Sequence, residues 1–172
     1  MAATATTLDA ETRATHADHD ALRLWLRLLT CTTLIEQRVR TKLRDRFAIS
    51  LPRFDLMAQL ERNPQGLRMG ELSRRLMVTG GNVTGITDQL VAEGLVERRP
   101  ITGDRRAFAV RLTPRGKRAF DAMAAAHEAW VIEMFAAMPR TERARLYALL
   151  GRVKAAVSAS EGEAGTPTED AA

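Results

Sequence analysis

The sequence is poor in the residues that most often carry catalytic chemistry. It has one cysteine, Cys31, so no disulfide can form within the chain, and only three histidines are available for metal binding. It contains no H-E-x-x-H, phosphate-binding P-loop or nucleophile-elbow motif. We therefore expect a protein that is not an enzyme and that binds no metal or cofactor.

Long apolar runs are also missing. No stretch approaches the roughly 18 apolar residues of a membrane-spanning helix. The first 20 residues lack the apolar centre of a secretion signal. We expect no membrane partner and predict a cytoplasmic location.

The net charge of +5 is unevenly distributed along the chain. Acidic residues gather at its two ends: Asp9, Glu11, Asp18, Asp20, Glu161, Glu163, Glu169 and Asp170. The middle is therefore strongly basic, and with 45% hydrophobic residues the chain has enough apolar side chains for a core. This pattern favours a polyanionic partner such as nucleic acid, although a solvated basic surface has the same composition.

Apolar periodicity predicts long helices at both ends of a central segment. Residues 1–17 and 159–172 are small and polar, and we predict disordered tails there. Residues 18–50 and 114–158 show helical spacing, the latter with a break at Pro139. These helices carry more apolar surface than one chain can bury, which predicts a homodimer built by terminal helices around a single compact domain.

The central segment, residues 51–113, contains a helix-turn-helix pattern. Helices are predicted over Met69–Met77 and Asn82–Glu93, with a turn at Val78–Gly81 whose two glycines permit a positive φ. Gly94 is expected to end the second helix.

Two predicted strands follow, residues 95–100 and 107–113, joined by a turn over Ile101–Arg106. A short strand at Leu67–Met69 is expected to pair with this hairpin. Thr113 and Pro114 then suit the N-cap and first position of the next helix. The fold class is thus mainly α with a small β-wing, a winged helix-turn-helix, which is a known way to read DNA.

The hairpin carries the most specific motif in the sequence, consisting of Asp104, Arg105, Arg106, Val110, Leu112, Thr113, Pro114 and Gly116. Behind a helix-turn-helix, this motif resembles the MarR family of bacterial transcriptional regulators, and the resemblance covers about residues 20–158. It implies a homodimeric repressor that binds a palindromic operator in double-stranded DNA and leaves it when a small effector binds. The alternative is a winged-helix scaffold that binds protein without sequence-specific DNA binding.

The resemblance also implies which residues contact DNA: Arg74, Arg75, Thr79, Asn82, Thr84, Gly85, Asp88, Gln89, Asp104, Arg105 and Arg106. Asparagine and glutamine can pair with adenine, whereas a wing arginine reads groove width. Gly85 and Gln89 stand where the family often has basic residues, so we expect the wing and phosphate contacts to supply most of the binding free energy. Thr84 and Gln89 are equally compatible with an ordinary exposed helix face. For Arg105 and Arg106 the alternative is a solvated turn, which the wing context disfavours.

An effector pocket between the winged core and the terminal helices is implied as well. Its expected lining is Trp25, Arg40, Arg53, Phe54, Met57, His127 and Trp130. An arginine there can pair with a carboxylate or phosphate, and the segment from Leu51 resembles members that sense aromatic acids or their coenzyme A thioesters. Alternatively, Trp25, Met57 and Trp130 are plain core residues and His127 is a hydrogen-bonded core histidine. Cys31 lies among residues that would not activate a thiol, so we expect a structural role rather than redox sensing.

Overall fold

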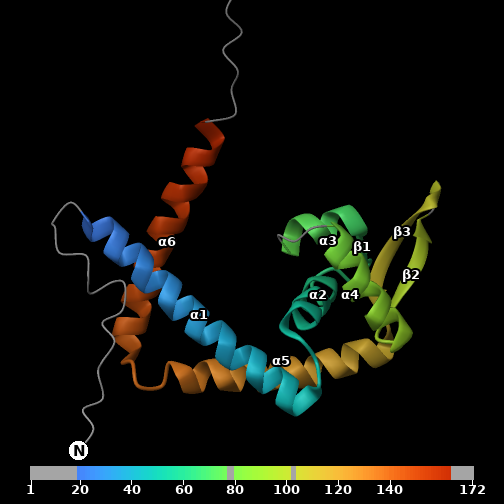
Figure 1. Cartoon of the computed structure of the whole chain (residues 1–172), viewed down its shortest axis with the longest axis horizontal. Coiled ribbons are helices and arrows are strands. Elements are labelled where there is room, and N and C mark those ends of the chain that lie inside the picture. Colours follow the sequence, from blue (N-terminus) through green and yellow to red (C-terminus); the bar gives the residue numbers. More distant parts are fainter. Residues whose placement is uncertain (1–18, 77–79, 102–103, 164–172) are drawn as a thin grey trace, which may run out of the picture. The chain divides into compact units, whose positions relative to one another are not determined.

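The computed structural model describes residues 19–76, 80–101 and 104–163, without the side chains of residues 104–107 and 160–163. These residues form α1 (Asp20–Phe47), α2 (Leu51–Glu61), β1 (Leu67–Arg68), α3 (Met69–Leu76), α4 (Gly80–Ala92), β2 (Val96–Ile101), β3 (Asp104–Leu112), α5 (Pro114–Met134) and α6 (Arg140–Glu163). The fold class is confirmed: helices dominate and a small antiparallel sheet forms the wing (Figure 1). No helix in the described ranges is both long and apolar enough to cross a membrane.

The chain divides into two compact units within α5, one ending at Trp130 and the other beginning at Val131. The regions predicted from the sequence meet at residue 114, at the start of α5. The first part of α5 belongs with the winged core because its apolar side chains pack there. The ring of Phe120 stacks on that of Phe54 in α2, with centroids 5.5 Å apart. The ring centroid of Trp130 lies 6.3 Å from that of Phe47 at the end of α1.

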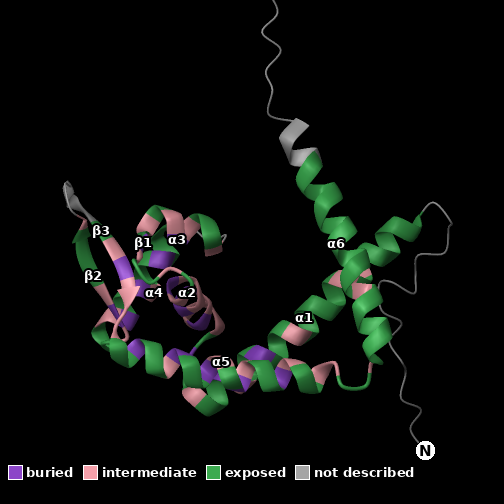
Figure 2. Cartoon of the chain, turned by 180° about the vertical axis from the view of Figure 1, so that it is seen from behind, coloured by how far each residue is buried: buried purple, intermediate pink, exposed green. Residues whose placement is uncertain are grey.

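The core of the first unit forms around α2. Its inward side chains are buried, namely Phe54, Leu56, Met57 and Leu60. Leu72 of α3, Val83 and Leu90 of α4, and Val110 of β3 are each buried as well, and Figure 2 shows buried residues in α2 and the sheet. In α3, Leu72 is buried while Arg74 and Arg75 are exposed, so the arginines lie on the solvent side of this helix.

The sheet has the strand order β1-β3-β2, with both pairs antiparallel. Leu67 pairs with Val110, which confirms the predicted strand beside the wing. The hairpin is longer than the sequence indicated, because Ile101 pairs with Asp104 and the strands take in both ends of the predicted turn over Ile101–Arg106. Only Thr102 and Gly103 lie between the paired residues, and they are outside the described ranges.

The predicted turn with two glycines is wrong in part. Gly80 and Gly81 belong to the first turn of α4, and neither has a positive φ. Glycine permits a positive φ without requiring it, and helix starts accept glycine readily. Helix α4 therefore begins before the predicted Asn82, and the rest of the predicted turn, Val78 and Thr79, lies outside the described residues.

The ends of the last two helices also differ from the prediction. α5 ends at Met134, before the predicted break at Pro139, and the residues between them form a turn. α6 continues to Glu163, into the stretch predicted as a tail. Ala159, Glu161 and Glu163 are good helix formers and favour this extension, whereas Gly162 opposes it.

One compact joint connects α4, the hairpin and α5. Gly94 has φ +67°, its N–H donates to the Val91 carbonyl (2.9 Å), and the Leu95 N–H donates to the Leu90 carbonyl (2.9 Å), which is the bonding of a Schellman helix end. The Thr113 hydroxyl donates to the Gly94 carbonyl (2.8 Å) and accepts from the Gly116 N–H (2.9 Å). The helix end at Gly94 and the N-cap at Thr113 are thus confirmed.

Candidate nucleic-acid interface and ligand cavities

Helix α4 separates its polar and apolar residues cleanly. Val83, Thr87 and Leu90 are buried. The residues that we expected to meet DNA are all exposed: Asn82, Thr84, Gly85, Asp88 and Gln89. Thr87 was not anticipated, and its hydroxyl donates to the Val83 carbonyl (2.8 Å), which satisfies it inside the core. α4 therefore presents one continuous polar face to solvent.

Asp88 is not an isolated negative charge on this face. Its carboxylate forms an ion pair with Arg98 of β2. The side chains are 55% and 37% exposed respectively, so the pair lies at the surface between the helix and the hairpin. Arg98 thus offsets the acidic residue on a face that would otherwise repel phosphate, and it links α4 to the wing.

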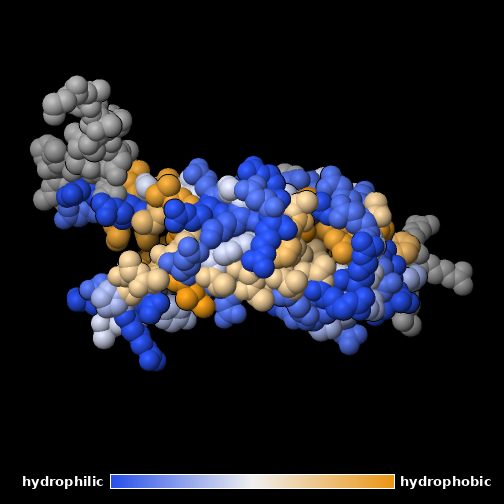
Figure 3. Space-filling view, turned by 90° about the horizontal axis from the view of Figure 1, so that it is seen from below, coloured by the Kyte–Doolittle hydropathy of each residue, from blue (hydrophilic) through white to orange (hydrophobic). Residues whose placement is uncertain are grey.

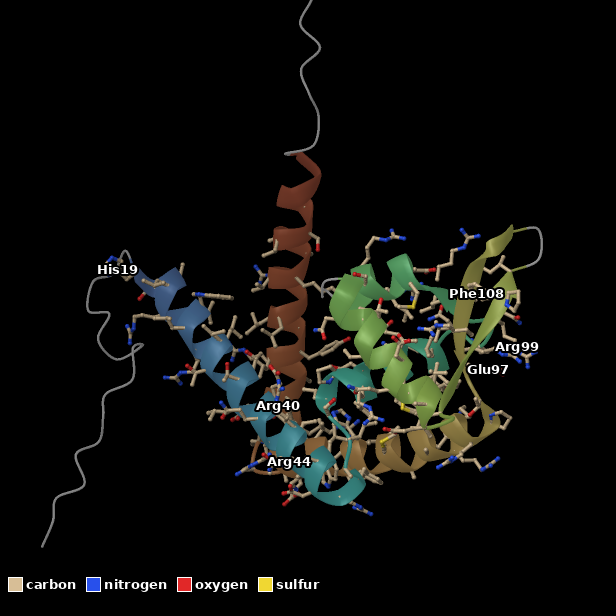
Figure 4. The ribbon with its side chains drawn as sticks, turned by 45° about the vertical axis from the view of Figure 1, so that its right-hand side comes forward. His19, Arg40, Arg44, Glu97, Arg99 and Phe108 are labelled. Atoms are coloured by element: carbon tan, nitrogen blue, oxygen red, sulfur yellow. The ribbon has the colours of Figure 1, made fainter. Side chains whose placement is uncertain are left out.

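The opposite face of the hairpin holds a second charged cluster. Glu97 lies between Arg111 (2.7 Å) and Arg99 (3.0 Å), and Figure 4 labels Glu97 and Arg99 on the hairpin. Hydrogen bonds from Arg111 and then Arg99 lower the pKa of Glu97. Two arginines share one carboxylate, so the cluster keeps a net positive charge. Arg98, Arg99 and Arg111 were missed as candidates, although their place in two alternating strands beside the wing turn was visible in the sequence.

Phe108 is an exposed apolar residue in the wing. It pairs with Pro100 and is 45% exposed, and it is labelled in Figure 4. Since side chains alternate along a strand, Phe108 shares a sheet face with buried Val110 but lies two residue pairs closer to the hairpin end. The sheet therefore offers an apolar surface next to the charged residues, which suits contact with deoxyribose better than with phosphate.

The remaining predicted DNA contacts have mixed outcomes. The backbone of Asp104, Arg105 and Arg106 runs in β3, and their side chains are outside the described part of the structure, as is Thr79. Arg74 is exposed at the end of α3. Arg75 is exposed too, but it pairs with Glu71 (2.6 Å) and lines a cavity.

A cavity of about 480 Å³ lies between α2, α3 and α5; its volume falls in the usual range for small-molecule sites. Phe54, Phe120 and Leu76 supply apolar walls. Polar groups come from Asp55, Gln59, Arg62, Arg75 and His127. The rings of Phe54 and His127 have centroids 5.2 Å apart. Aromatic walls with cationic groups suit a flat anion.

Asp55 is the acidic group of this cavity. Partial burial raises the pKa of its carboxyl, and Glu36 acts in the same direction, whereas His127 and Arg40 oppose it. An anionic ligand would be repelled by the Asp55 carboxylate and attracted by Arg62 and Arg75. The arrangement of these charges would therefore favour an anion whose negative group lies nearer the arginines than Asp55.

Only some of the expected ligand residues reach this cavity. Phe54 and His127 line it. Met57 is fully buried, and Trp130 packs beneath Lys42 and beside Phe47, so both belong to the core.

The remaining expected ligand residues lie elsewhere. Trp25 is 57% exposed on α1. Arg40 is exposed and pairs with Glu36, and Figure 4 shows it on α1. Arg53 lines a separate, smaller cavity. Amphipathic spacing identified inward residues but not which of them border a void.

Comparison with known proteins places these features in a family. A family profile described as MarR family matches residues 49–107. A crystal structure of a MarR family transcriptional regulator from Silicibacter pomeroyi is 32% identical, with a TM-score of 0.70 over 83% of this chain and 99% of that chain. The HTH-type transcriptional regulator PecS of Dickeya dadantii (strain 3937) is 28% identical over 128 residues, which cover 73% of this chain and 77% of PecS. Streptococcus pneumoniae FabT, solved in complex with DNA, is 25% identical, with a TM-score of 0.68 over 81% of this chain and 98% of that chain.

Proposed function

Since this chain belongs to the MarR family of DNA-binding transcriptional regulators, we propose that it is a homodimeric repressor that binds a palindromic operator and leaves it when an aromatic acid or its coenzyme A thioester binds. The observation that carries this proposal is the continuous polar face of α4 beside a basic hairpin. In this arrangement α4 enters the major groove and the wing lies along the adjacent minor groove. FabT, whose structure was solved in complex with DNA, supports DNA binding by a chain of this fold.

Exposed apolar residues support the homodimer. In the first unit, α1 exposes Leu22, Leu24, Trp25, Leu29 and Leu34. In the second unit, α6 exposes Tyr147, Leu149, Leu150, Val153 and Val157. Apolar side chains (orange) are visible among hydrophilic ones in Figure 3. Apolar surface of this extent on helices favours burial against a second copy, and twofold symmetry then matches a palindromic operator.

The larger cavity is our proposed effector site. Its stacked phenyl rings and its arginines suit an aromatic carboxylate, and a thioester tail would extend from it into solvent. Because the cavity touches α2, α3 and α5, a ligand there contacts the helices that support α4. A ligand weakens DNA binding only to the extent that it prefers the conformation that does not fit the operator.

The DNA part of the proposal is tested by fluorescence anisotropy with the DNA upstream of the gene for this chain and with a shuffled sequence of the same composition. We expect at least tenfold preference for the upstream DNA and a steep loss of affinity with salt. Arg106→Ala is expected to weaken binding more than Gln89→Ala does. Equal affinity for both sequences would contradict sequence-specific binding and favour the protein-binding scaffold.

The effector part is tested with benzoate, using cyclohexanecarboxylate as a non-aromatic match. Benzoate is expected to raise the melting temperature and to release DNA, because it stabilises the state that it binds. Ala124→Leu, which fills the larger cavity, is expected to remove both effects, whereas Ala119→Leu outside that cavity is the matched control. Retention of both effects in Ala124→Leu would place the effector elsewhere.

A further inference from the structure

The hairpin of β2 and β3 has two chemically different faces. Residues directly opposite each other in an antiparallel pair point to the same side of the sheet, so the register assigns each pair to one face. One face holds the charged cluster around Glu97. The other, which we call the inner face, is turned toward α4, because its Arg98 forms the ion pair with Asp88. The inner face consists of the pairs Val96–Leu112, Arg98–Val110 and Pro100–Phe108.

The inner face changes from buried to exposed toward the end of the hairpin. Val110 is fully buried in the core. Phe108 lies two residues further along β3, or about 7 Å at 3.4 Å per residue, and almost half of it is exposed (Figure 4). Its partner Pro100 is exposed as well. Two apolar rings therefore stand in water beside the polar face of α4.

The position of these rings decides what they contact. A single exposed apolar residue needs no explanation, but this pair continues the face that a DNA-binding chain presents to DNA. With α4 in the major groove and the wing in the adjacent minor groove, one sugar–phosphate strand runs between α4 and the inner face.

The inner face is poorly equipped to bind the phosphates of that strand. Among its described side chains, the one cation is Arg98, and the Asp88 carboxylate already offsets its charge. Pro100 has no backbone N–H to donate, and the side chain of Phe108 has no polar atom. The apolar part of a DNA strand is its deoxyribose carbons, and these match the two rings.

We propose that Phe108 and Pro100 bind deoxyribose at the minor-groove edge of the strand that separates the two grooves. This inference rests on the placement of α4 and the wing in our proposed function. The contact removes apolar surface from water and releases no counterion, so its share of the affinity does not depend on salt. It also favours DNA over RNA, because a ribose 2′-hydroxyl against Phe108 loses water without gaining a hydrogen-bond partner.

The first test measures the affinity of the whole chain for its upstream DNA by fluorescence anisotropy over a series of KCl concentrations. Phe108→Ala is expected to weaken binding about tenfold at every salt concentration, with the slope of log K against log [KCl] unchanged. Phe108→Gln should bind as weakly as Phe108→Ala, whereas Phe108→Leu, which stays apolar, should remain within about threefold of the native chain. Native affinity in Phe108→Ala and Phe108→Gln, or a slope reduced by about one, would overturn the proposal.

The second test identifies the sugar itself. Single deoxyribonucleotides of the upstream duplex are replaced in turn by ribonucleotides, each of which adds one 2′-hydroxyl in the minor groove. At the contacted sugar, the replacement is expected to weaken native binding about fivefold and to leave Phe108→Ala unaffected, as in a double-mutant cycle. If every replacement affects the native chain and Phe108→Ala equally, Phe108 contacts no sugar.

Failure of this inference differs from failure of the proposed function. A sugar contact carries no base information, so Phe108→Ala should weaken binding to the shuffled duplex by the same factor as to the upstream DNA. Equal native affinity for both duplexes, with Phe108→Ala weaker on each, would refute the sequence-specific repressor and retain the sugar contact. Preference for the upstream DNA with no effect of Phe108→Ala would do the reverse.

Discussion

Among the described glycines, Gly116 is the one where an added methyl group should lower the free energy of unfolding most. A Cβ atom built on Gly116 would lie 1.8 Å from the Leu95 carbonyl oxygen and 2.7 Å from its carbonyl carbon. Both are backbone atoms, so no side-chain rotation relieves the clash. Relief needs a movement of more than about 1 Å between α5 and the end of α4, since close-packed carbon atoms prefer separations of about 3.5–4 Å.

That movement sets the expected magnitude for Gly116→Ala. Overpacking costs about 1–3 kcal/mol. Two hydrogen bonds of Thr113, to the Gly94 carbonyl and from the Gly116 N–H, would be strained or lost at about 1 kcal/mol each. The better helix propensity of alanine offsets at most about 1 kcal/mol of this loss in stability. We therefore expect a loss of about 2–4 kcal/mol in the free energy of unfolding, or roughly 10 °C in melting temperature.

The assay is urea unfolding followed by circular dichroism, with Gly85→Ala as the matched control. Gly85 is also a helical glycine, but a Cβ there meets nothing within 4 Å. Gly85→Ala should therefore be more stable than the native chain by about 0.5–1 kcal/mol. If Gly116→Ala unfolds within about 1 kcal/mol of the native chain, α5 does not approach Leu95 as closely as described.

Three further predictions follow from other contacts. Thr113→Ala should lose about 1 kcal/mol of stability with the N-cap, and Thr113→Ser should restore it; failure of serine to restore it would exclude a capping role. Asp88→Asn and Arg98→Gln should show a coupling of about 0.5–1 kcal/mol in a double-mutant cycle on unfolding, whereas additive effects would mean that the ion pair contributes nothing. Asp55→Asn should raise the melting temperature at pH 7. The raised pKa means that the folded state prefers the protonated carboxyl, so stability from this group is present below pH 3.8 and lost as the pH rises through its folded-state pKa. The advantage of Asp55→Asn should shrink on acidification, and an advantage that grows instead would contradict the burial argument.

The sequence was most informative where a residue acts on its own chain neighbours. Gly94 and Thr113 identified helix ends correctly because a positive φ and an N-cap are local properties. Gly80 and Gly81 show the limit of the same reasoning. Their freedom allowed a turn, but the chain uses them as the first turn of α4.

The cavities depended on packing that periodicity does not encode. Phe54 and Met57 lie on the inner side of α2, yet Phe54 borders the larger cavity and Met57 is enclosed by core. Asp55 is a carboxylate between the apolar residues Phe54 and Leu56, and this placement could have indicated a polar group at a cavity. Our prediction of the ligand residues did not include it. Arg53 was expected as a ligand residue, but its ion pair with Glu93 and its place in the smaller cavity became visible only in the structure.

The joint at Gly94, Thr113 and Gly116 holds the C-terminal end of α4, so a small rotation at the joint produces its largest displacement at the N-terminal end of the helix. Helix α4 has 13 residues and is therefore about 20 Å long. A tilt of about 10° about the joint would displace its first residues by roughly 3.4 Å, which is the spacing of successive base pairs. A tilt at the joint that is too small to disturb the core would therefore displace the first residues of α4 by a distance comparable to one base-pair step.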